Sequence, residues 1–97
     1  KMPVHFVVEM FMDRIAACKV YQKENYTDAS PWLYHKQSRR VHTLMHPDSL
    51  RLLERLLKML AVRGEDETFA YVRKILRHDR QQRLREFLHR NEIRKKR

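Results

Sequence analysis

The hydrophobic positions of residues 3–21 follow a helical period on two sides of one segment. The first stripe contains residues spaced three or four apart, as on one face of a helix: Val4, Val8, Phe11, Ile15 and Cys18. A second stripe on roughly the opposite side is formed by Phe6, Met10, Ala17 and Val20. A helix that is apolar nearly all the way round needs neighbours on more than one side. The pattern therefore predicts a central helix, Pro3 to Tyr21, that other parts of the protein cover.

A second helical segment is predicted after the polar loop KENYTDAS. Ser30 followed by Pro31 is a helix-start signature, with Ser30 as the N-cap and Pro31 in the first turn. This helix is expected to run from Pro31 to about Ser38 and to place Trp32 at one edge of the core.

The most regular helical pattern lies between Pro47 and Arg63. Its leucines cover about half of the circumference, and charged residues cover the rest. Gly64 is expected to end this helix, and a last helix is expected to begin near Asp66. The apolar pattern of that helix weakens after Leu76. The chain is therefore expected to divide into a helical domain, residues 1–76, and a projecting, partly frayed basic helix or tail, residues 77–97.

The composition favours an all-α fold. The 97 residues include one Gly and three Pro, which is too few for a sheet protein with frequent turns. We expect three to four helices packed around the central helix. The single cysteine, Cys18, cannot form an internal disulfide and is expected to be an inert, buried thiol. The sequence contains no recognisable membrane span or signal peptide, and we expect a cytoplasmic protein that does not contact a membrane.

The net charge of +10 is concentrated at the C-terminal end, where residues 77–97 hold nine Lys or Arg and three acids. Such a density of positive charge attracts phosphate backbones. Only Phe87 is available to stack on bases, and a solvated tail is the alternative interpretation. The candidate residues for binding nucleic acid or another polyanion are Arg77, Arg80, Arg83, Arg85, Arg90, Arg94, Lys95, Lys96 and Arg97.

Asp13 lies between members of the second stripe and is the sharpest functional clue in the chain. A carboxylate is rarely buried without a cation, a hydrogen-bond donor or a metal ion. One interpretation is a metal ligand, because divalent metals use carboxylates and a helix holds one rigidly. The alternative is an ion pair with an arginine of a neighbouring helix, or a place at a wet seam beside Glu9.

Histidines supply weaker signals. His42 and His46 are four residues apart, the spacing of two ligands on one helical turn. Pro47 disfavours a regular turn there, and His46 is expected to cap the helix that Pro47 begins. A second interpretation is that both histidines line a pocket in which Arg39 and Arg40 contact a phosphate group.

The dipeptide His78-Asp79 has the letters of a metal-binding His-Asp pair. No further Asp follows it in the sequence, and Arg77 and Arg80 flank it. We interpret this stretch as a solvated helix face.

Four segments of the sequence together resemble those of a known family. The chain resembles the C-terminal half of an uncharacterised bacterial family, classified as a domain of unknown function, whose members are sometimes labelled catalase. The likeness extends from about Lys1 to Leu76. It is carried by PVHFVVEMFMDRIAACKVY, NYTDASPWLYH, MHPDSLRLLERLLKML and GEDETFAYVRKIL.

That family is similar to the HD-type metal-dependent phosphohydrolases, which hold a divalent metal with an upstream His, a His-Asp pair and a final Asp. The resemblance implies that Asp13 matches the final Asp and that the other ligands lie in a missing upstream segment, before Lys1. The chain would then be an inactive part of a longer protein. No haem pocket is recognisable. Two other functions stay open: a basic module that binds nucleic acid, and an interaction domain that binds a partner through the second stripe.

Overall fold

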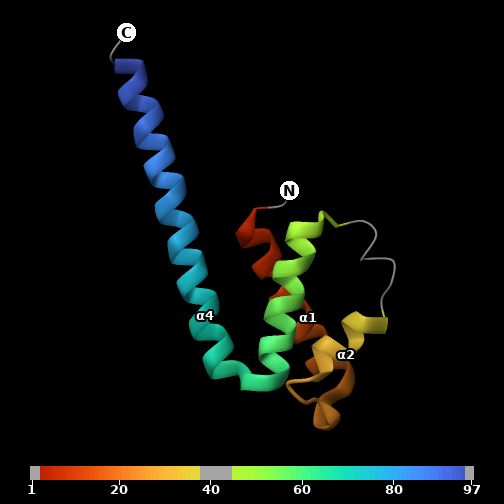
Figure 1. Cartoon of the computed structure of the whole chain (residues 1–97). Helices are drawn as coiled ribbons and strands as arrows, with labels where there is room; N and C mark the ends of the chain where they lie inside the picture. Colours follow the sequence, from red (N-terminus) through yellow and green to blue (C-terminus); the bar gives the residue numbers. More distant parts are fainter. Residues whose placement is uncertain (1–2, 38–44, 96–97) are drawn as a thin grey trace.

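The computed structural model describes residues 3–37 and 45–95, and these residues form helices and connecting turns without a strand (Figure 1). The elements are α1 (Val4–Gln22), the 3-10 turn η1 (Lys23–Asn25), α2 (Ser30–Gln37) and α4 (Pro47–Lys95). The prediction of an all-α fold is confirmed. The expectations for Arg39, Arg40, His42, Lys96 and Arg97 lie outside the described residues.

α1 is buried on one side only. Its buried residues are Val7, Val8, Phe11, Ile15 and Cys18, which include most of the first predicted stripe. The second stripe is largely uncovered, since Phe6 is 46% exposed and Val20 is 68% exposed. The expectation that other helices cover α1 on both sides is therefore not met within the described part of the chain.

The core is an apolar layer between the buried side of α1 and α4. α4 contributes residues that are at most 6% exposed: Leu53, Leu56, Leu57, Leu60 and Val72. Fully burying one leucine side chain stabilises the fold by about 1.5–3 kcal/mol relative to leaving it in water. α4 packs against both α1 and α2, and α1 also contacts α2.

α2 closes the edge of this core. His35 is fully buried, and its Nε2 lies 3.3 Å from Glu54 Oε2 on α4. The Trp32 ring stacks on the His35 ring at 5.9 Å between centroids and packs against the core. The expected place of Trp32 at the core edge is therefore observed.

The entry to α2 differs from the expected cap. The Thr27 N–H donates to Ser30 Oγ at 3.0 Å, and the Ser30 N–H donates to the Thr27 carbonyl at 2.9 Å. α2 begins at Ser30, so Ser30 is the first helical residue and the predicted N-cap position is off by one residue. Its hydroxyl still closes the entry to the helix, because it accepts the Thr27 N–H.

Gly64 turns the chain sharply within α4. Its backbone angles, φ 84° and ψ 176°, belong to a region open essentially to glycine alone. The prediction that Gly64 ends the helix that begins at Pro47 is confirmed, because a new helical segment starts after it in a different direction (Figure 1).

Side chains from three elements meet beside this bend. Lys19 Nζ of α1 lies 2.8 Å from Glu65 Oε1 and 5.4 Å from the centre of the Tyr26 ring. Burial raises the pKa of Tyr26 to about 12, and the nearby charges of Asp28 and Glu65 act in the same direction. The phenol therefore stays neutral while Lys19 holds the acid next to the bend.

The last part of α4 extends beyond the other helices (Figure 1). Every residue from Gln81 to Arg90 is exposed, and the molecule measures 61 × 30 × 20 Å. None of the described helices is both long and apolar enough to cross a membrane.

Replacing Gly64 by alanine is expected to destabilise the protein by about 1–3 kcal/mol, because the new Cβ forces a strained backbone. The added carbon would have room, since its nearest neighbour is Asp28 Oδ2 at 3.5 Å. Urea unfolding measures the loss. The matched control is Val62→Ala, at an 83% exposed helical position, which should change stability by less than about 0.5 kcal/mol. Equal stability of Gly64→Ala and wild type would contradict the described bend.

Candidate functional site on α1

The uncovered side of α1 forms a surface that we call the outer face. Its members lie on the side opposite the core and comprise Phe6, Glu9, Met10, Asp13, Ala17 and Val20. Phe6, Val20, Ala17 and both acids are exposed, whereas Met10 is partly buried. Apolar side chains with two acids among them thus face outward along the length of the helix.

Asp13 is exposed, which corrects the expectation of an enclosed carboxylate. No ion pair or hydrogen bond joins Asp13 to another described residue. The alternative of an ion pair with a neighbouring arginine is therefore not observed in this part of the chain. The physical reason is that α2 and α4 both pack on the other side of α1 and leave the outer face to solvent.

Glu9 lies one helical turn from Asp13 on the same face. Residues four apart on a helix have Cβ atoms about 5–6 Å from each other, so the two carboxylates are neighbours. No group of three or more His, Cys, Asp or Glu within residues 3–37 and 45–95 is arranged to hold a metal ion. A metal at Asp13 would take its remaining ligands from water or from another polypeptide segment, because magnesium and manganese favour about six oxygen ligands.

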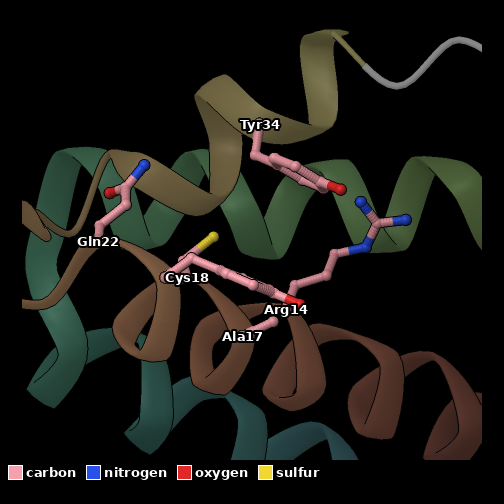
Figure 2. Close-up of a pocket in the computed structure, with 6 residues that line it drawn as sticks. Arg14, Ala17, Cys18, Gln22 and Tyr34 are labelled. Carbon is pink, nitrogen blue, oxygen red and sulfur yellow. The ribbon is translucent and has the colours of Figure 1, made fainter.

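A cavity of about 370 Å³ adjoins the outer face, between α1 and α2 (Figure 2). Ala17 belongs to both the outer face and the cavity wall. In Figure 2, Cys18 and Gln22 of α1 are directed toward α2, and the Arg14 side chain rises beside Tyr34. The full lining is Arg14, Ala17, Cys18, Tyr21, Gln22 and Tyr34.

Two groups in the cavity wall have shifted pKa values because they are buried. Burial lowers the pKa of the Arg14 guanidinium, although Tyr34 and Cys18 partly oppose this shift. Burial raises the pKa of the Cys18 thiol, and the positive charge of Arg14 opposes that rise. Cys18, at 6% exposure, is therefore a protonated thiol near neutral pH. The prediction of a buried cysteine is confirmed.

The cavity was not predicted from the sequence. Arg14, Cys18 and Gln22 are spaced by four residues, and this spacing places them along one side of α1. A row of polar and apolar residues at this spacing was the only sequence feature that could have pointed to the cavity. It was not informative without the position of α2, which supplies Tyr34 and closes the space.

The remaining histidine candidates have structural roles. His46 is exposed, and its Nδ1 accepts a hydrogen bond from the Asp48 N–H at 3.1 Å. The prediction that His46 caps the helix starting at Pro47 is confirmed. His78 is exposed, as expected for a solvated helix face, whereas the adjacent Asp79 is partly buried and pairs with Arg83 at 2.9 Å.

The basic end of α4 presents its charges to solvent. Its exposed basic residues include Arg77, Arg80, Arg83, Arg85 and Arg90. Phe87 is 59% exposed, and Leu84 and Leu88 are similarly uncovered. Arg94 and Lys95 lie in the last turn of α4. The structure thus brings the outer face and the cavity together on α1, and the basic end is a separate region.

Two phenylalanines of α1 test the difference between its faces. Phe11→Ala is expected to cost about 3–5 kcal/mol, because Phe11 is fully buried. Phe6→Ala should cost about 1 kcal/mol or less, because Phe6 is 46% exposed. Chemical denaturation of both variants provides the comparison. Similar losses for the two would mean that the outer face is already covered in this protein.

A scan against protein-family models, a search of curated proteins and a search of solved structures each found no match for this chain.

Proposed function

We propose that this chain is the helical C-terminal part of an HD-like, metal-dependent phosphohydrolase, with Asp13 as one ligand of a divalent metal ion. The observation that supports this most is the position of Asp13 itself. Its carboxylate stands on an apolar, solvent-exposed helix face and has no cationic partner among the described residues.

An apolar surface of this kind favours association with another part of a protein. Exposed apolar groups gathered on one face mark interaction sites in soluble proteins. A segment covering the outer face would remove Asp13 from water, and an unpaired buried carboxylate is energetically costly. A divalent metal shared with ligands of the covering segment would compensate that cost. We assign this role to the segment that precedes Lys1 in a longer protein.

The metal-binding atoms that this chain offers determine which ligands the preceding segment would have to supply. Asp13 offers carboxylate oxygens, which suit magnesium, manganese or iron. A bound metal supplies an activated water and polarises the phosphoryl oxygens. The His-Asp pair and the upstream histidine would come from the preceding segment, so the 97-residue chain alone is expected to be inactive. Arg39, Arg40 and His42 are proposed phosphate contacts on sequence grounds.

We also propose a cytoplasmic location. The single cysteine is a free, buried thiol, and disulfide-free small domains are typical of reducing compartments.

The test of the metal proposal uses a protein extended upstream of Lys1, with metal content and phosphatase activity measured together. Asp13→Asn is expected to reduce metal affinity and activity at least about tenfold, since it removes an anionic ligand. Glu9→Gln is the matched control on the same face and should retain most of the metal. An extended protein without bound metal, or one whose metal is indifferent to Asp13→Asn, would refute the assignment.

A second candidate function, binding of nucleic acid or another polyanion, is favoured by the exposed basic end of α4. Truncation after Leu76 removes +6 of the +10 net charge and is expected to abolish a gel shift with duplex or single-stranded nucleic acid. The wild-type affinity should fall steeply between low and moderate salt. The variant Arg51→Gln, which removes one exposed charge elsewhere on α4, is the control. Unchanged binding after truncation would eliminate this function.

A further inference from the structure

The cavity between α1 and α2 contains a positive charge that no described residue neutralises. Arg14 is partly buried in its wall, and no ion pair or hydrogen bond joins it to another described residue. Burying an uncompensated charge is unfavourable. The lowered pKa of Arg14 has the same origin, because burial is its largest cause. The cavity is therefore electrostatically suited to an anionic group.

The remaining walls suit a flat, apolar body. Ala17 and the two tyrosines, Tyr21 on α1 and Tyr34 on α2, line the cavity. Tyr21 is 86% exposed and Tyr34 is 57% exposed. Aromatic rings favour offset or edge-to-face contact with another ring. At about 370 Å³, the volume falls within the range of small-molecule sites.

We propose that this cavity binds a small aromatic anion, with its carboxylate or phosphate group on Arg14 and its ring against Tyr21 and Tyr34. Guanidinium groups bind both kinds of anion with paired, charge-assisted hydrogen bonds. Figure 2 shows the geometry required: the Arg14 guanidinium lies near the hydroxyl end of Tyr34, at one end of the space. The site needs no metal and none of the acids of the outer face, so it stands apart from the proposed hydrolase function.

The experiment is a titration of the 97-residue chain with phenyl phosphate and with benzoate, followed by calorimetry. Saturable binding of either probe supports the site, and the tighter probe identifies the preferred anionic group. Inorganic phosphate and phenol are the comparison ligands, and each should bind at least about tenfold more weakly because it offers only half of the recognised chemistry. Inorganic phosphate binding as tightly as phenyl phosphate would overturn the aromatic assignment.

Arg14→Gln is expected to weaken binding of the better probe about tenfold or more, since it removes the charge that pairs with the anion. Arg73→Gln is the matched control, because Arg73 is exposed on α4, away from the cavity lining. Binding that is equally weakened by both variants, or by neither, would contradict the proposal.

A chain with a net charge of +10 attracts anions at many places, so the position of binding is measured directly. Amide shift mapping on the wild-type protein needs no variant to fold. Shifts that saturate within residues 14–22 and 30–37 support the cavity. Shifts confined to residues 77–91 would show general attraction to the basic end and would overturn the proposal. Neither outcome depends on metal content, so the result is independent of the test of Asp13.

Discussion

The structure depends on the apolar layer between the buried side of α1 and the leucines of α4. Phe11 and four leucines of α4 are fully buried there, and both α2 and the segment after Gly64 are positioned around this layer. A chain of this size has little apolar surface to spare. The fully buried leucines of α4 all pack on one side of α1, so they leave the other side uncovered. The exposure of the outer face is thus a direct result of how the core is filled.

The periodicity of apolar residues predicted where the helices lie, but it did not predict which faces of the helices are buried. The two stripes of α1 have the same spacing and similar apolar character, so the pattern alone could not show which would be buried. That choice is made by the position of α4, which depends on contacts far apart in the sequence. The exposure of Asp13 was missed for the same reason. Local chemistry was more informative at Gly64 and His46, where backbone freedom and a nearby acceptor decide the outcome.

The candidate site follows the same division. Asp13 could be selected from the sequence because an acid within an apolar stripe is unusual. The cavity could not, because Arg14 and Tyr34 come from different helices and each is unremarkable alone. A site formed by residues of one helix can be predicted from the sequence. A site formed between two helices can be predicted only when the packing of those helices is known. In this protein the outer face and the cavity adjoin one another along α1, and Ala17 belongs to both.

The uneven placement of charge has a consequence for the behaviour of this protein at high concentration. Residues 77–95 of α4 carry seven Lys or Arg against three acids and extend beyond the other helices, so they create a local positive field. Physiological salt limits the reach of that field to roughly 8 Å. The protruding helices of two copies therefore repel one another at short range, and added salt weakens this repulsion.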